Sequence, residues 1–204
     1  MTTSEVDGAS EVTRPEISIS TNIQAVTDEA INALLPDREV FQRGGEIVRV
    51  RRVEHDPPAG RVRREEGAPY VGVACKTWLR ERTSIAADWW KADARSKGGW
   101  APSLPPEWVV ETMRARGSYP FPALVGVVEA PCLRADGTVV DAPGYDAASG
   151  LFYAPNRAYP PLPKRITRDD AVAAAGRILS CVSEFPWVAD SDQSAWLAWV
   201  LTLV

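Results

Sequence analysis

Two glycine-containing turns divide residues 121–155 into segments that are too short for helices. Asp136-Gly137 forms the first turn, and an Asp-Gly pair tolerates the positive φ angles that a tight β-hairpin requires. The second turn contains Gly150 and separates Tyr145 from another short apolar segment. This spacing predicts two successive hairpins.

An apolar run rich in β-branched residues precedes these hairpins. It extends from Ala123 to Val128 and predicts a strand that is buried on both faces. Together with the hairpins, which carry Tyr145, Phe152 and Tyr153, the run predicts a small β-meander with an aromatic face. The segment contains no pattern typical of a nucleophile or of a phosphate-binding loop.

The rest of the pattern predicts an α+β chain. Gly44-Gly45 indicates the turn of a further hairpin, with strands at 40–42 and 46–53, and a short buried strand follows at 70–74. We expect loops at 55–60 and 95–106 and helices at 27–35 (N-cap Thr27), 76–91, 106–113, 167–182 (capping box Thr167 and Asp170) and 195–204.

Composition along the chain predicts four parts. The first residues are small, polar and acidic, which is typical of a disordered segment, and three prolines mark a linker after the meander. The expected parts are a tail at 1–14, an α+β domain at 15–158, a Pro-rich linker at 159–166 and a C-terminal helical element at 167–204.

Charge is distributed unevenly in this chain of 204 residues. The net charge of −4 argues against a protein whose whole surface binds nucleic acid, yet residues 38–64 hold eight arginines and four acids. The predicted hairpin strand places Arg49 and Arg51 on one face, where guanidinium groups suit phosphates, although a solvated surface is the simpler interpretation. The candidate nucleic-acid-binding residues are Arg43, Arg49, Arg51, Arg52, Arg61, Arg63 and Arg64.

The chain has eight tryptophans, which can form a core or stack on single-stranded bases. Most lie on apolar faces of predicted helices, so core packing is expected for Trp78, Trp89, Trp108, Trp196 and Trp199. Trp100 lies in a segment rich in lysine and glycine and is the one expected to be exposed.

No residue pattern predicts a catalytic, metal or cofactor site. The three cysteines are far apart and lack CxxC spacing, which argues against zinc and disulfides and favours a reducing cytoplasm. Asp136, Asp141 and Asp146 could converge on a metal, but carboxylates in turns more often hold local backbone N–H groups. The only histidine, His55, lies in a Pro-rich loop, and no signal or membrane-inserting segment follows Met1.

Two stretches of the meander, APCLRADGTVV (130–140) and APGYDAASGLFYAP (142–155), carry a resemblance to a known family. They resemble a pattern found in large ATPases of phages, plasmids and integrated elements, which are often described as helicases or primase-helicases. Flanking stretches agree in order: PEISIST (15–21), VFQRGGEIVRVRR (40–52), PPEWVVETMRARGSYP (105–120) and SEFPWVADSDQSAWLAWVLT (183–202). The resemblance covers residues 14–204.

The resemblance implies a nucleotide-binding core downstream of the last predicted helix. The printed sequence contains no GxxxxGK[ST], so the loop, lysine and hydroxyl of a P-loop are missing from it. Residues 195–204 are apolar except for one threonine and include no helix-ending signal. We therefore expect either a truncated longer protein or a segment that docks on a partner through Trp196, Trp199 and Leu203.

Three functional hypotheses remain open at this point. The first is a non-catalytic lead-in or adaptor region of a mobile-element DNA replication ATPase, which positions DNA or a partner while an ATPase domain, in cis or in trans, hydrolyses nucleotide. The second is a stand-alone protein-interaction module whose apolar C-terminal helix binds a separately encoded ATPase. In either case we expect the isolated chain to self-associate or to be poorly soluble. The third is a small hydrolytic or nucleotidyl-transfer enzyme that uses the meander aspartates.

Overall fold

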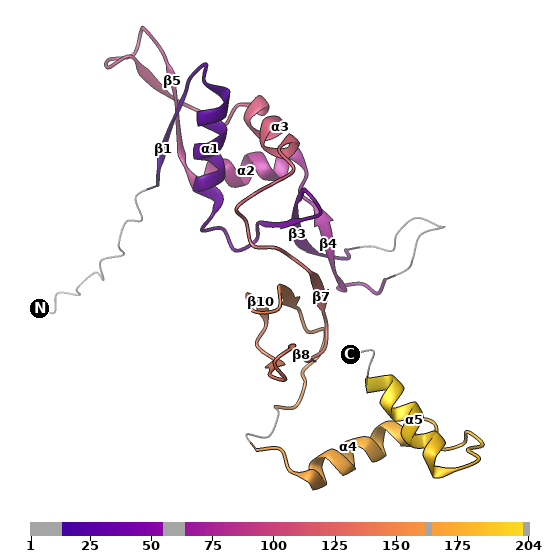
Figure 1. Ribbon diagram of the computed structural model, residues 1–204. Coiled ribbons are helices and arrows are strands. Elements are labelled where there is room, and N and C mark those ends of the chain that lie inside the picture. Colours follow the sequence, from indigo (N-terminus) through magenta and orange to yellow (C-terminus); the bar gives the residue numbers. More distant parts are fainter. Residues whose placement is uncertain (1–13, 55–63, 162–164, 202–204) are drawn as a thin grey trace, which may run out of the picture. The chain divides into compact units, whose positions relative to one another are not determined.

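A computed structural model describes residues 14–54, 64–161 and 165–201, and the α+β prediction is confirmed (Figure 1). The predicted tail (except Arg14), the loop at 55–60 and part of the linker lie outside the described residues. The helices are α1 (Ile23–Leu34), α2 (Lys76–Ala86), α3 (Glu107–Ala115), α4 (Arg168–Ser180) and α5 (Asp190–Leu201). The strands are β1 (Glu16–Ile19), β2 (Phe41–Arg43), β3 (Glu46–Arg52), β4 (Pro69–Val73), β5 (Asp88–Ala92), β6 (Trp100–Ser103), β7 (Gly126–Val128), β8 (Cys132–Leu133), β9 (Val139–Val140), β10 (Gly144–Asp146) and β11 (Leu151–Tyr153).

The chain forms two compact units. The first unit comprises Met1–Val127 and Tyr145–Phe152, and the second comprises Val128–Gly144 and Tyr153–Val204. In the first unit, helices α1, α2 and α3 lie between strands β1 and β5 and strands β3 and β4 (Figure 1).

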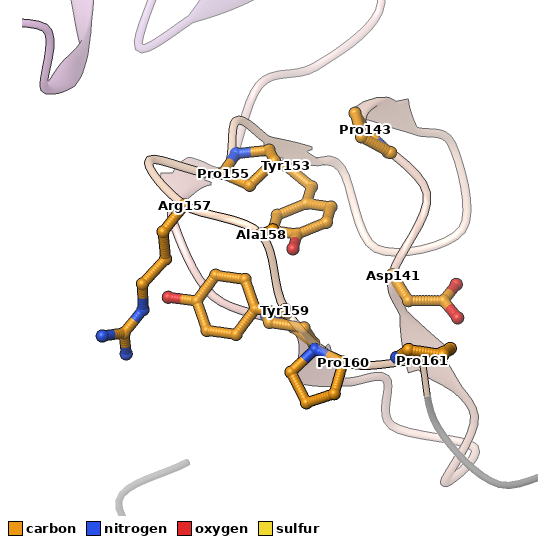
Figure 2. Close-up of a pocket in the computed structure, with 10 residues that line it drawn as sticks. Asp141, Pro143, Tyr153, Pro155, Arg157, Ala158, Tyr159, Pro160 and Pro161 are labelled. Atoms are coloured by element: carbon orange, nitrogen blue, oxygen red, sulfur yellow. The ribbon is translucent and has the colours of Figure 1, made fainter.

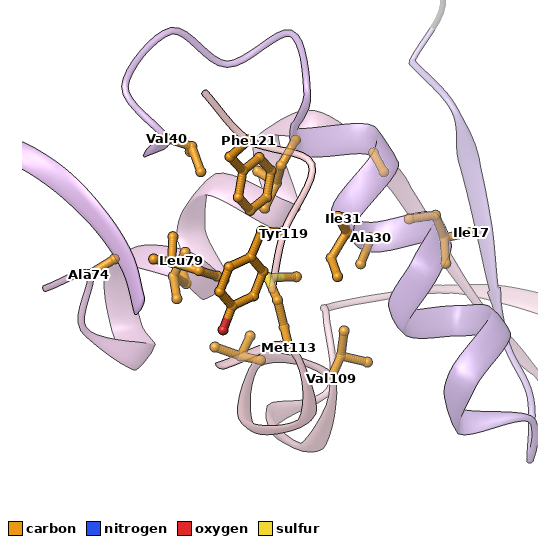
Figure 3. Packing of buried hydrophobic residues seen from close by; sticks show 14 of the residues in the cluster. Ile17, Ala30, Ile31, Val40, Ala74, Leu79, Val109, Met113, Tyr119 and Phe121 are labelled. Carbon is orange, nitrogen blue, oxygen red and sulfur yellow. The ribbon is translucent and has the colours of Figure 1, made fainter. Parts of the chain in front are cut away.

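One apolar core joins these three helices to both sheets (Figure 3). Tyr119 and Phe121 stack with their ring centroids 5.8 Å apart, and both rings are buried in it. The buried side chains of the core come from β1, α1, the β2–β4 region, α2, β5, α3 and the segment after α3: Ile17, Val26, Ala30, Ile31, Leu34, Val40, Ile47, Ala74, Leu79, Ala87, Trp89, Val109, Val110, Met113, Tyr119 and Phe121.

Helix α1 begins one turn earlier than the sequence predicts. Asn22 is the N-cap, because its side-chain oxygen accepts the backbone N–H of Ala25 at 3.1 Å. The predicted cap, Thr27, is buried inside the helix and donates its hydroxyl to the carbonyl oxygen of Ile23 at 2.7 Å. The N-cap prediction was therefore wrong, because the true cap lies five residues earlier in the sequence.

The sheet of β1, β5 and β6 corrects two further predictions. The predicted helix over 76–91 ends at Ala86, and residues 88–92 form β5 instead, which pairs in parallel with β1 and antiparallel with β6. Part of the predicted loop over 95–106 is also a strand, because Trp100–Ser103 pair with β5 and form β6. Burial of Trp89 against the core in a strand outweighs the helical spacing of this segment.

The hairpin around Gly44-Gly45 is confirmed. Both glycines have positive φ angles, and β2 pairs antiparallel with β3, which in turn pairs antiparallel with β4. One face of this sheet packs Phe41 and Val48 into a second apolar cluster with Leu124, where the Phe41 ring lies 5.1 Å from the Tyr145 ring. The other face carries Arg49 and Arg51.

Both predicted hairpins are confirmed, but they belong to two separate sheets and not to one continuous meander, because β7 pairs with β11. Strands β8 and β9 form the first hairpin, and β10, β11 and β7 form a sheet in that order. The strand predicted over Ala123–Val128 is shorter, because β7 covers only Gly126–Val128 and its residues are half-buried. Ala123 instead forms an isolated parallel bridge with Gln42.

Helices α4 and α5 form a helical element in the second unit. The predicted capping box is confirmed, because the Thr167 hydroxyl oxygen accepts the Asp170 N–H and the Asp170 carboxylate accepts the Thr167 N–H. None of the described side chains of either helix is buried. An edge-on contact between Trp187 and Trp196, with ring centroids 6.1 Å apart, precedes the exposed end of α5.

Candidate nucleic-acid interface

Two arginines of β3 lie against aromatic rings. The Arg49 Cζ lies 4.5 Å from the centroid of Trp78 on α2, and the Arg51 Cζ lies 5.6 Å from the centroid of Tyr70 on β4. Arg82 of α2 approaches the same Trp78 ring at 5.6 Å. A cation over an aromatic face is attracted by the ring quadrupole, so these contacts hold the guanidinium groups in place. We call the side chains of Arg49, Arg51, Tyr70 and Trp78 the arginine face.

Strand register explains why the Arg51 side chain packs beside Tyr70 and Gly72. Arg51 is paired with Tyr70 and Arg49 with Gly72. A Cβ atom at Gly72 would lie 3.0 Å from the Arg51 Cδ and 3.4 Å from Tyr70. The missing side chain at Gly72 therefore leaves the space in which the Arg51 stem packs beside Tyr70.

The positive charges of this hairpin are not neutralised by neighbouring acids. Within the described part of the chain, no carboxylate forms an ion pair with Arg43, Arg49, Arg51 or Arg52. By contrast, Arg82 forms a two-point ion pair with an acid at 2.6 Å. Among the described residues, these four guanidinium groups therefore lack an acidic partner, although Arg52 donates to the carbonyl oxygen of Gly67.

One buried donor on the arginine face lacks a partner. The Nε of Arg49 is shielded from solvent and makes no hydrogen bond to any described residue. Buried donors are nearly always paired in folded proteins, so an unpaired one is a recognised mark of a functional or strained position. The contact with the Trp78 ring thus positions the Arg49 guanidinium, while its Nε–H has no hydrogen-bond partner among the described residues.

The structure brings together only some of the predicted arginines. Arg49 and Arg51 share one face, whereas Arg52 alternates to the other and donates to the carbonyl oxygen of Gly67 at 2.9 Å. Arg43 is exposed at the end of β2, in register with Glu46, and Arg64 donates to the carbonyl oxygen of Pro69 at 3.3 Å. The remaining candidates, Arg61 and Arg63, lie outside the described residues.

Sequence reasoning missed the aromatic half of this face. Trp78 is half-buried against the core, as expected, but its ring also contacts two guanidinium groups, those of Arg49 and Arg82. In the observed register, Tyr70 lies opposite Arg51 and Gly72 lies opposite Arg49. Knowledge of the register of β3 and β4 would therefore have indicated the contact between Arg51 and Tyr70.

The other predicted aromatic residues divide between core and surface. Trp89 is buried and Trp108 packs against the core, in agreement with the prediction. Trp100 is 44% exposed, also as predicted. Trp199, however, is 59% exposed, so core packing was the wrong expectation for it, and Trp196 is half-buried. Leu203 lies outside the described residues.

A separate pocket of about 510 Å³ lies in the second unit (Figure 2). Its wall includes five prolines together with Asp141, Tyr153, Arg157 and Tyr159. Figure 2 shows the Tyr153 hydroxyl inside the pocket, whereas the Arg157 guanidinium points away from it and lies 5.0 Å from the Tyr159 centroid. Burial raises the pKa of the Tyr153 phenol above its ordinary value of 10.0. The lining residues offer hydrogen bonds but no nucleophile beside a base.

Two of the three meander aspartates hold turns, whereas Asp141 lines the pocket and makes no hydrogen bond to a described residue. Asp136 accepts the backbone N–H of Thr138 at 2.9 Å, and Asp146 accepts that of Ser149 at 3.0 Å, as the turn interpretation predicts. The Thr138 hydroxyl also donates to Asp136 and holds the pKa of that carboxyl below its usual value. Among the residues with described positions, no group of three or more His, Cys, Asp or Glu side chains could hold a metal ion. The three cysteines are free thiols.

Comparisons with family models, with curated proteins and with solved structures found no match for this chain. No helix in the described ranges combines the length and apolar character needed to cross a membrane.

Proposed function

We propose that this chain is a non-catalytic, DNA-binding lead-in region of a mobile-element replication ATPase, such as a helicase or primase-helicase. The observation that carries the DNA-binding part is the arginine face: Arg49 and Arg51 lie on aromatic rings and have no acidic partner among the described residues. The sequence resemblance supports the remainder, including an ATPase domain in cis or in trans and a cytoplasmic location.

The chemistry of this face suits phosphates better than bases. Guanidinium groups form two-point hydrogen bonds with phosphate oxygens, and such contacts carry no sequence information. Binding should therefore be indifferent to sequence, with a Kd of roughly 10⁻⁴ to 10⁻⁶ M at physiological salt, and it should weaken as salt increases.

The test compares two variants that lose equal charge. One replaces Arg49, Arg51 and Arg52 with alanine, and the control replaces Arg165, Arg168 and Arg177, which lie in or next to α4 in the second unit. Anisotropy of a labelled oligonucleotide, measured over a salt series, reports the affinity. We expect the hairpin variant to lose about one unit of salt slope for each phosphate contact removed, and the control to resemble the wild type.

Equal losses in the two variants would show that only net charge matters and would contradict a site on the hairpin. Unchanged binding in the hairpin variant would exclude the arginine face. We also expect no hydrolysis of ATP or GTP by the chain, because the sequence contains no P-loop motif.

A second candidate function is favoured by a different observation. No described side chain of α4 or α5 is buried, and Phe185, Trp199 and Leu201 are exposed, so this element presents more apolar surface than a solvated helical pair requires. It would act as a protein-interaction module that docks on a separately encoded ATPase. Substitution of Trp199 should then abolish association without affecting DNA binding, and substitution of the β3 arginines should do the reverse.

A further inference from the structure

A second exposed face of the first unit lies on the sheet of β1, β5 and β6. Register pairs Trp90 with Pro102 and Ala92 with Trp100. Side chains alternate along a strand, and Trp89 points into the core, so Trp90 and Ala92 point to the opposite side. Cross-strand partners share a face, which brings both indoles to the outer side of the sheet. We call Trp90, Ala92, Trp100 and Pro102 the indole face.

The two indoles of this face are not packed on each other. No ring contact joins Trp90 and Trp100 among the described residues, and the small Ala92 lies beside Trp90 on β5, opposite Trp100. Trp100 is 44% exposed, and Ala92 and Pro102 are exposed as well. Trp90 is half-buried, and its indole N–H is shielded from solvent without a hydrogen-bond partner in the described structure. Two aromatic surfaces are thus held at fixed positions on a paired sheet.

The turn that joins β5 to β6 supplies positive charge next to the indole face. Arg95 and Lys97 are both exposed there, and the Arg95 side chain is 96% exposed. The acids of this hairpin are engaged within the chain: Asp88 forms an ion pair with Arg14 at 2.5 Å, and Asp93 accepts the backbone N–H of Arg95 at 3.0 Å and pairs with the Arg95 side chain at 3.8 Å. Two cations, Arg95 and Lys97, stand against the single acid Asp93, so the turn keeps a net positive charge that favours a polyanion.

We propose that the indole face binds the bases of single-stranded nucleic acid, while the turn at Arg95 and Lys97 contacts its phosphates. Bases have apolar faces that stack on indoles, and single strands expose those faces, whereas duplexes bury them. An apolar protein partner would not need the adjacent cations. This inference rests on the proposed DNA binding and specifies its form as a preference for single strands.

The test compares a labelled 20-nucleotide oligo(dT) with a DNA duplex of equal length. Trp100→Ala should weaken oligo(dT) binding about fivefold or more, which corresponds to roughly 1 kcal/mol for one stacked base, and should leave duplex binding unchanged. Trp199→Ala is the control, because it removes an exposed indole from α5 in the other unit. The thermal midpoint of each variant checks folding. Trp100 is the preferred position, because replacing the half-buried Trp90 would also remove packing contacts and lower stability.

The outcomes separate this inference from the arginine face. Loss of oligo(dT) binding in Trp100→Ala, with no effect of the arginine substitutions, would support the indole face and exclude the arginine face. Unchanged oligo(dT) binding in Trp100→Ala, or equal loss for single strand and duplex, would overturn the indole face alone. A wild-type chain that binds neither DNA would overturn both. If Trp100→Ala changes only the sedimentation of the chain, the face is a protein interface and the inference is wrong.

Discussion

The carboxylate of Asp37, just after α1, accepts two hydrogen bonds from the guanidinium of Arg82 on α2, with Nε–Oδ2 and Nη2–Oδ1 distances of 2.6 and 2.7 Å. Hydrogen bonding to Asp37 raises the pKa of Arg82 above its already high ordinary value. Because Arg82 also lies over Trp78, the pair fixes α1, α2 and one side of the arginine face. The side chains are partly shielded, with 11% of Asp37 and 25% of Arg82 exposed.

Asp37→Asn should therefore lower the free energy of unfolding by about 1–2 kcal/mol, because the amide cannot receive both charge-assisted hydrogen bonds. Urea denaturation followed by circular dichroism measures this change. Glu111→Gln is the matched control, since it breaks the well-exposed ion pair with Lys76 and should have no measurable effect. Equal losses in the two variants would contradict a special role for the Asp37–Arg82 pair.

Gly150 is the turn residue of the meander that tolerates least change. Its φ is +71°, and a Cβ atom would lie 2.8 Å from the Val125 Cγ2 and 3.1 Å from the Ala123 carbonyl oxygen. Gly150→Ala should cost roughly 2–4 kcal/mol, through backbone strain together with this clash.

Gly137 provides the matched control for this prediction. Its φ is +81°, but the space that a Cβ atom would occupy there is open. Gly137→Ala should therefore cost only about 1 kcal/mol, from the backbone conformation alone. Thermal unfolding of both variants tests the difference, and equal midpoints would show that the clash at Gly150 is relieved by movement of Val125.

Local signals predicted the parts of the fold that depend on neighbouring residues. Gly44, Gly137 and Gly150 indicated the correct turns, because a positive φ is a property of the turn itself. Strand β5 could not be predicted in this way. Trp78, Ile85 and Trp89 recur near helical spacing, and only pairing with β1 and β6 makes residues 88–92 extended.

In the candidate sites too, features set by neighbouring residues could be predicted from the sequence, and contacts between distant elements could not. A period of two predicted that Arg49 and Arg51 share a face, and the structure agrees. The sequence did not indicate that Trp78 would lie under Arg49, because that contact joins a strand and a helix through tertiary packing. The indole face was missed because residues 95–106 were expected to form a loop, so nothing placed Trp100 in a sheet beside Trp90.

The capping box of α4 predicts a response to acid. The Thr167 hydroxyl and backbone N–H donate to the Asp170 carboxylate and hold the pKa of that carboxyl below its usual value of 3.8. A lowered pKa in the folded state means that this contribution is fully present above the unfolded-state pKa and is lost as the pH falls through the folded-state pKa.

Amide hydrogen exchange at Ala171 to Ala175 should therefore speed up relative to the intrinsic rate as the pH falls from about 5 to about 2. Asp170→Asn should show faster exchange at pH 5 and a smaller further change on acidification. An identical pH response in this variant would assign the loss of protection to other carboxylates. Thr167→Ser, which keeps the hydroxyl, should behave like the wild type.

Helix α5 is predicted to control self-association. Trp199 is 59% exposed and Leu201 is 58% exposed, and no described residue of the helix is buried. Exposed apolar surface of this kind favours association with a second copy of the chain. Trp199→Glu should therefore increase the monomer fraction in analytical ultracentrifugation and leave the helical signal unchanged. Ser194→Glu adds the same charge to an exposed polar position on the same helix and should have little effect. If both variants shift the equilibrium equally, charge repulsion and not the Trp199 surface controls association.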